Sequence, residues 1–105
     1  MRLLAFDLAL SLIHSLRPTL EALRRHDAPL AKQLRTALAS VALNAAEALG
    51  RTGGDRPHLF RIALGSLREV NAVLDVAIAF GYLAEAPLAA ERDRLGGLLY
   101  GLQRG

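Results

Sequence analysis

The sequence of 105 residues contains no cysteine and no tryptophan. Without cysteine the chain cannot form disulfides, bind zinc through thiolates or use a thiol nucleophile. Its aromatic residues are three Phe and two Tyr, so the 52% hydrophobic content comes mainly from Leu and Ala, which is typical of helices packed on helices. This apolar content exceeds what one small core can bury. We therefore expect other copies of the chain to cover some apolar surface.

Lysine is nearly absent as well: the chain has one Lys and twelve Arg. The formal net charge is +3 and the sequence pI is about 10.2. Arginine favours forked contacts to phosphate and carboxylate, although an Arg bias can equally reflect the coding bias of a genome. A charge of +3 is weak evidence for nucleic-acid binding, since such footprints are normally larger and more clustered.

The sequence also lacks a hydrophobic run long enough to cross a bilayer. The longest run, residues 76–84, is about half of the ~20 residues that a membrane-spanning helix needs. Residues 1–16 superficially resemble a signal sequence, but Asp7 interrupts them and no small-residue cleavage site precedes Arg17. We therefore expect a cytoplasmic protein that does not contact a membrane.

Helical periodicity divides the chain into four segments with short connections. The first covers residues 3–25 and contains Pro18, which predicts either a kinked helix or two shorter ones. The second covers residues 30–51. Asp27 precedes it as the expected N-cap, and Gly50 suits the left-handed residue that often follows a helix.

The third segment covers residues 55–80, with Asp55 as its expected N-cap and Gly81 as its end. The fourth is expected to open at Pro87 and to continue to the end of the chain. There is no repeat and no low-complexity tract. The sequence therefore predicts an all-α protein, a single antiparallel up-down-up-down four-helix bundle spanning residues 1–105.

The second helix has two unlike faces. At 100° per residue its apolar residues form a broad arc, and beside them runs a stripe about 80° wide that is polar but mostly uncharged. A solvent-facing stripe is usually rich in Lys and Glu, so this one predicts side chains that hydrogen-bond to protein or ligand. The stripe comprises Gln33, Thr36, Ser40, Asn44, Glu47 and Arg51.

No pattern predicts catalysis or metal binding. Metal sites in bundles use carboxylates and histidines three or four residues apart on facing helices, whereas His14, His26 and His58 lie on different segments. His58, in the first turn of the third helix, could act as a base but has no visible nucleophile or orienting partner. We therefore expect no enzyme, no metal and no cofactor.

The cations that could bind phosphate lie on the second and third helices and the turn between them. Arg51, Arg56 and Arg61 are expected to gather at one end of the bundle, where an oligomer would form a ring of positive potential. The alternative is a solvated rim without a ligand. The full set is Lys32, Arg35, Arg51, Arg56, Arg61 and Arg68. Glu47 and Glu69 are expected to form ion pairs or capping contacts that fix helix register.

Several motifs together resemble a bacterial family of four-helix bundles. They are residues 33–35 (QLR), Ser40, 44–47 (NAAE), 50–51 (GR), 60–66 (FRIALGS), Glu69 and 81–83 (GYL). This family includes proteins encoded by intervening sequences in large-subunit ribosomal RNA genes. It is similar to the accessory variability protein of diversity-generating retroelements. The resemblance spans residues 30–83 and departs from the usual pattern where Ala42 replaces a Pro and Ala48 a Gly, which favours a straighter second helix.

The resemblance implies a homopentamer of four-helix bundles and, for the retroelement relatives, nucleic-acid binding and docking to a reverse transcriptase. It makes six polar residues candidates for packing or ligand contacts: Gln33, Ser40, Asn44, Glu47, Ser66 and Glu69. We therefore expect a non-enzymatic oligomeric module that binds RNA or DNA through an Arg-rich end, as an accessory to a nucleic-acid enzyme. The alternative is a structural oligomer or protein-interaction scaffold whose polar stripe only fixes helix packing.

Overall fold

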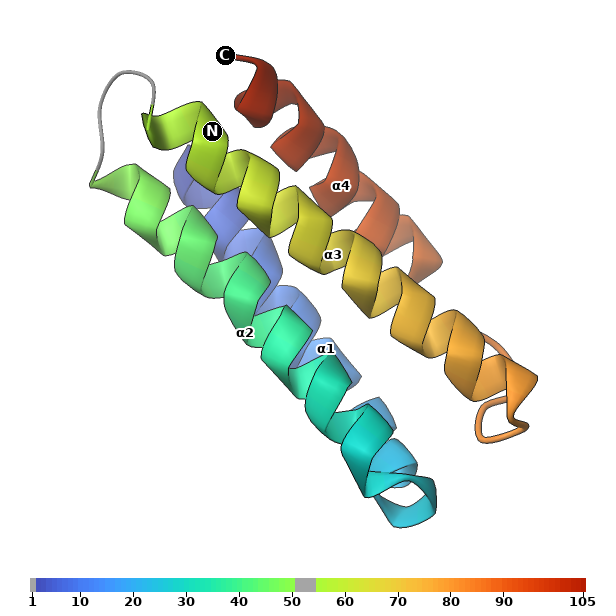
Figure 1. Ribbon diagram of the computed structural model, residues 1–105. Helices are drawn as coiled ribbons and strands as arrows, with labels where there is room; N and C mark the ends of the chain where they lie inside the picture. The colour runs from blue at the N-terminus through green and yellow to red at the C-terminus, as the bar shows by residue number, and fades with distance from the viewer. Residues whose placement is uncertain (1, 51–54) are drawn as a thin grey trace.

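The computed structural model describes residues 2–50 and 55–105, which form four α-helices and no strand (Figure 1). Each helix packs against the next in the chain, and α1 also contacts α4, which closes the bundle. The α1–α2 turn and the α3–α4 connection lie at one end, opposite the start of α1 and the end of α4. The predicted all-α antiparallel four-helix bundle is thus confirmed. Its helices are α1 (Arg2–His26), α2 (Ala28–Leu49), α3 (Asp55–Ala79) and α4 (Ala89–Arg104).

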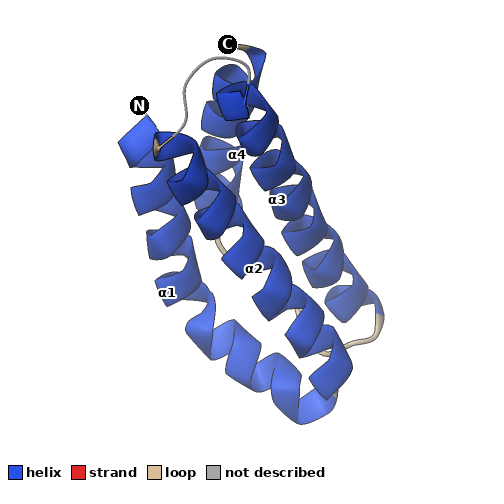
Figure 2. Cartoon of the chain, turned by 60° about the vertical axis from the view of Figure 1, so that its left-hand side comes forward, coloured by secondary structure: helices blue, strands red, loops and turns tan. Residues whose placement is uncertain are grey.

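The first helix runs unbroken through Pro18. Proline removes a backbone donor and crowds the preceding turn, so it normally bends a helix. Figure 2 shows the axis of α1 changing direction along its second half, towards the α1–α2 turn. The helix stays continuous because Leu16 before the proline and Leu23 after it are both fully buried in the same core. Of the two alternatives, a kinked helix or two shorter ones, the structure shows the single bent helix.

The second helix begins as expected and ends differently. The side chain of Asp27 accepts a hydrogen bond from the Leu30 N–H at 3.0 Å, which confirms it as the N-cap. Gly50, however, has φ −91° and ψ 2°, so the expected left-handed residue is not there. Its N–H instead donates to the Glu47 carbonyl at 3.1 Å, and this tight last turn closes the helix without a left-handed backbone.

The third helix starts at Asp55, which is therefore a residue of its first turn rather than the residue before it. It ends near the expected place. Gly81 has φ +81°, its N–H donates to the Ile78 carbonyl, and the Tyr82 N–H donates to the Ala77 carbonyl. These two bonds form a Schellman motif, which confirms Gly81 as the stop.

The fourth helix begins at Ala89, so the expectation that Pro87 opens it is wrong. Leu88 has the left-handed angles φ 60° and ψ 40°, which interrupt helical geometry after the proline. The Pro87 carbonyl accepts a hydrogen bond from Arg92 Nε at 2.9 Å, and this side-chain contact fixes the entry into α4. The start of α4 is thus displaced by two residues from the proline.

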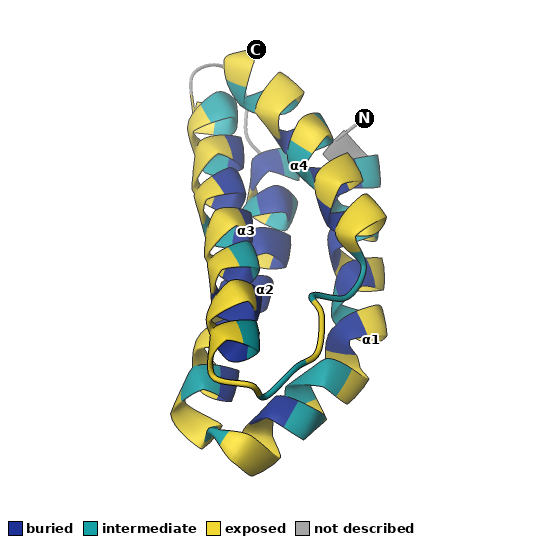
Figure 3. Cartoon of the chain, turned by 90° about the vertical axis from the view of Figure 1, so that its right-hand side faces the viewer, coloured by how far each residue is buried: buried dark blue, intermediate teal, exposed yellow. Residues whose placement is uncertain are grey.

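The core is built from the inner faces of all four helices, as the burial colours of Figure 3 show. Phe60 is its largest fully buried side chain. The inner face of α2 is largely alanine, and these small side chains let α1 and α3 approach it closely. The buried alanines of α2 are Ala31, Ala37, Ala42, Ala45 and Ala48.

Candidate nucleic-acid interface

The middle of the polar stripe on α2 bonds to protein. Ser40 Oγ and Ser66 Oγ lie 2.7 Å apart across the α2–α3 interface, and Asn44 Nδ2 donates to Ser40 Oγ at 3.1 Å and to the Ser40 carbonyl at 2.9 Å. All three side chains are half-buried. The stripe therefore links two helices, and packing accounts for these three residues without a ligand.

The remaining polar residues of the family motif face outward. Gln33, Glu47 and Glu69 are exposed. Glu69 makes no ion pair with another described residue, so the expected register-fixing pair is not found there; an exposed carboxylate is solvated and needs none.

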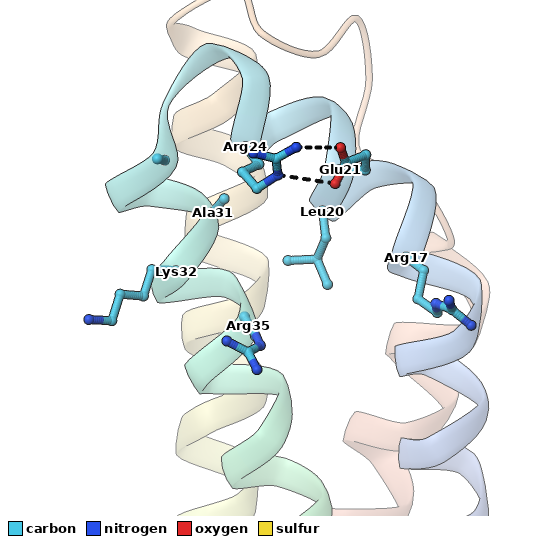
Figure 4. A pocket seen from close by; sticks show the side chains of 8 residues that line it. Arg17, Leu20, Glu21, Arg24, Ala31, Lys32 and Arg35 are labelled. Carbon is cyan, nitrogen blue, oxygen red and sulfur yellow. Dashed lines mark hydrogen bonds and ion pairs between the residues drawn. The ribbon is translucent and has the colours of Figure 1, made fainter.

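A groove of about 530 Å³ lies between α1 and α2, close to the turn that joins them (Figure 4). Two predicted cations, Lys32 and Arg35 on α2, line it together with Arg17 and Arg24 on α1. Its remaining lining is mostly apolar and comprises Leu20, Glu21, Ala28 and Ala31. The fold thus adds two cations to those that the sequence indicated.

The acidic residue of this groove is already neutralised. Two guanidinium nitrogens of Arg24 donate to the Glu21 carboxylate, Nη2 to Oε1 at 2.6 Å and Nε to Oε2 at 3.1 Å (dashed lines in Figure 4). The hydrogen bond and the charge of Arg24 lower the pKa of Glu21 below its ordinary value. Because the pair is exposed, it contributes little to stability, but it cancels the groove's negative charge.

The other three cations of the groove are uncompensated. Arg17, Lys32 and Arg35 are exposed, and within residues 2–50 and 55–105 none of them has a hydrogen-bond or ion-pair partner. Side chains of this kind can turn towards a ligand without breaking an existing contact. The groove therefore presents three free positive charges over an apolar floor.

The other predicted cations do not join this groove. Arg61 Nε donates to Gln103 Oε1 at 3.3 Å and so links α3 to α4, while Arg56 is half-buried in the first turn of α3. Both belong to the first part of α3, whose start lies at the end of the bundle opposite the α1–α2 turn (Figure 1). Arg51 lies outside the described residues, and with it the expected gathering of all three cations.

Arg68 lines a second groove of about 400 Å³, between α3 and α4. The floor of this groove holds Arg92, which is 9% exposed and is the one buried charged side chain of the described residues. Its Nη1 donates to Asn71 Oδ1 at 2.7 Å and its Nε to the Pro87 carbonyl at 2.9 Å. Arg92 was missed by sequence reasoning, although its spacing to the buried Leu95 and Leu99 places it on the core face.

The described part of the chain holds no group of three His, Asp or Glu side chains that could bind a metal ion. His14, His26 and His58 are all exposed. The expectation that each lies on a different segment is wrong for the first two, because α1 extends to His26 and so contains both, while His58 lies on α3. Within the same residues, no helix is both long and apolar enough to cross a membrane.

Residues 3–101 match the protein family described as 23S rRNA-intervening sequence protein. No curated protein and no solved structure matches the chain. The family match extends beyond the motifs in residues 30–83 to include most of α1 and α4. The chain is therefore a member of the 23S rRNA-intervening sequence protein family.

Proposed function

We propose that this chain is a non-enzymatic module that binds RNA through the groove between α1 and α2. The observation that carries the proposal is the unbalanced charge of that groove. Arg17, Lys32 and Arg35 have no partner among the described residues, and Arg24 already neutralises Glu21. Positive side chains in this arrangement attract phosphates and release condensed counterions on binding.

RNA is a better first ligand than DNA because of the family. Its description connects these proteins with 23S rRNA. Phosphate contacts alone do not distinguish RNA from DNA, so the groove supports either polymer and the family supports RNA. Docking to a reverse transcriptase remains a prediction from the resemblance to retroelement proteins.

The test is a salt series with a labelled RNA and a DNA of matched sequence. Binding should weaken steeply with salt, and Arg35→Ala should weaken it at low salt and reduce the slope of log K against log salt by about 1. Arg94→Ala is the matched control, because Arg94 is exposed on α4 and does not line the groove. No binding of either polymer at low salt would leave the scaffold alternative.

We also propose that the chain self-associates, with five copies as the expected number. The supporting observation is apolar surface on α2 and α3. Leu43 is 67% exposed, and Ile62 and Val76 on α3 are 39% and 40% exposed. Large apolar side chains in water favour burial against another surface, and assembly would also multiply the cationic grooves.

Light scattering tests this assembly directly. The parent should have a mass of five chains, and Leu43→Lys should shift it towards the monomer because a buried unpaired charge opposes association. Leu43→Ala, with less apolar area and no charge, should have a smaller effect. A monomeric parent would contradict the assembly proposal but would leave the groove proposal intact.

The scaffold alternative has one specific observation in its favour. The Ser40–Ser66 contact and its Asn44 donor explain the middle of the polar stripe through helix packing. A protein that uses its polar residues only in this way would show no salt-dependent RNA binding. The same salt series therefore separates the two functions.

A further inference from the structure

Three flat rings are stacked at the end of the bundle that carries the α1–α2 turn and the α3–α4 connection. The rings of His26 and Tyr82 have centroids 5.2 Å apart and planes 12° apart. Those of Phe80 and Tyr82 are 5.4 Å apart with planes inclined at 20°. Tyr82 is thus the central ring of a stack whose outer members are His26 and Phe80.

The central ring is held in place from several sides. Its burial, together with the charge of Asp27 and a hydrogen bond to that carboxylate, raises the pKa of Tyr82 above its ordinary value. Asp27 is itself held in place, because its side chain caps α2. The backbone N–H of Tyr82 donates a hydrogen bond to the Ala77 carbonyl. The stack is consequently preorganised, and its outer rings rest on a fixed centre.

The outer rings face solvent. Phe80 is 65% exposed and His26 is also exposed. A large aromatic side chain that remains this open adds little to the core, and a second flat group could pack on its free face. The stack therefore ends in two ring faces accessible to a ligand.

A basic side chain, Arg25, lies between the stack and the cationic groove. The last turn of α1 consists of Arg24, Arg25 and His26. Successive residues are 100° apart around a helix, so Arg25 lies between Arg24 at the groove and His26 in the stack. The side chain of Arg25 is 71% exposed, and its contact with Glu21 is long, at 4.0 Å.

We infer that this ring stack is a base-stacking site, in which unpaired RNA bases pack on Phe80 and His26 while the adjoining phosphates follow Arg25 into the groove. The inference rests on the proposed RNA binding and goes further by naming the ligand as RNA with unpaired bases. Aromatic rings next to basic side chains suit single strands, because each base offers a free face to stack. Bases in a duplex are already stacked on each other and cannot reach the rings.

The test compares two forms of one RNA. The probe is an oligouridylate of about 12 nucleotides, a length within the usual range of single-strand sites, that carries one 2-aminopurine. The second form is the same strand paired with its complement. The unpaired form should bind more tightly than the duplex, and its 2-aminopurine fluorescence should be quenched on binding.

Two variants identify the rings. Phe80→Leu keeps an apolar side chain without a flat face, and it should weaken binding of the unpaired RNA about tenfold and abolish the quenching. His26→Leu should have an effect in the same direction. Tyr100→Leu is the matched control, because Tyr100 is 51% exposed on α4 and lies outside the stack. It should behave as the parent does.

The outcomes separate the two proposals. If no form of the RNA binds at low salt, the proposed function itself fails. If binding is salt-dependent but is equal for the unpaired and paired forms and unchanged in Phe80→Leu, the stacking inference is overturned and the groove proposal stands. If Phe80→Leu lowers the mass in light scattering together with RNA affinity, the ring belongs to an interface between copies, and stacking is again overturned.

Discussion

The groove between α1 and α2 and the groove between α3 and α4 hold arginines in opposite environments. Between α1 and α2, Arg17 and Arg35 are exposed and have no partner among the described residues. Between α3 and α4, Arg92 is buried and its guanidinium is bound to Asn71 and Pro87. Burial requires that a charge be satisfied, whereas exposure leaves it free for a ligand. The buried Arg92 therefore stabilises the fold, whereas the exposed cations of the first groove are the ones that we propose for binding.

Removing Arg92 should have the largest effect on stability. Arg92→Ala leaves Asn71 Oδ1 and the Pro87 carbonyl without their donor and removes buried packing, so the free energy of unfolding should fall by about 2–3 kcal/mol. Urea unfolding measures this change. Arg94→Ala, an exposed neighbour, should stay within about 0.5 kcal/mol of the parent. Equal effects of the two variants would show that burial does not distinguish these arginines.

The contact between α2 and α3 should contribute less. Ser40→Ala removes the oxygen that Ser66 and Asn44 share, and it should lower the free energy of unfolding by about 1 kcal/mol. RNA affinity of the folded protein should not change. Ser15→Ala, an exposed serine on α1, is the control for loss of a hydroxyl. A loss of RNA binding without a loss of stability would instead make the polar stripe a ligand site.

A substitution of Glu21 tests the first groove alone, because it should change RNA affinity and leave stability almost unaffected. Glu21→Gln removes the negative charge of the cationic groove and frees Arg24, so RNA affinity should rise a few-fold at low salt. The exposed pair contributes little to stability, so the unfolding temperature of Glu21→Gln at neutral pH should be only slightly lower than that of the parent. Glu91→Gln on α4 is the matched control. Reduced affinity in Glu21→Gln would mean that the carboxylate orients Arg24 for binding.

The pH dependence of Glu21 follows from its lowered pKa. A carboxylate with a depressed pKa in the folded state adds stability above its ordinary value of 4.5, and this contribution is lost as the pH falls through the lowered pKa. Acidification should therefore remove the difference in unfolding temperature between the parent and Glu21→Gln. A difference that persists below that range would have another cause.

The fold could be predicted from local signals. Helical periodicity located four helices, and Asp27 and Gly81 marked two boundaries through their own side-chain or backbone chemistry. The start of α4 could not be predicted in this way. Leu88 there has a left-handed backbone, and the Arg92 side chain bonds to the Pro87 carbonyl. Helical periodicity predicts neither feature.

The candidate site was predictable only in part. Lys32 and Arg35 were identified on their own helix, but their association with Arg17 and Arg24 depends on which faces of α1 and α2 meet. The ring stack joins the end of α1 to a connection more than fifty residues away in sequence. Contacts of this range are set by packing of the whole bundle, which periodicity in one helix does not specify.

The central claim is that the cations between α1 and α2 bind RNA and that those on α3 do not. The most direct measurement compares the salt dependence of RNA binding in Lys32→Ala/Arg35→Ala and in Arg61→Ala/Arg68→Ala, which lose the same number of charges. The account predicts that the first variant reduces the slope of log K against log salt by about 2 and that the second retains the parental slope. Retention of the parental slope in the first variant and its loss in the second would contradict the account.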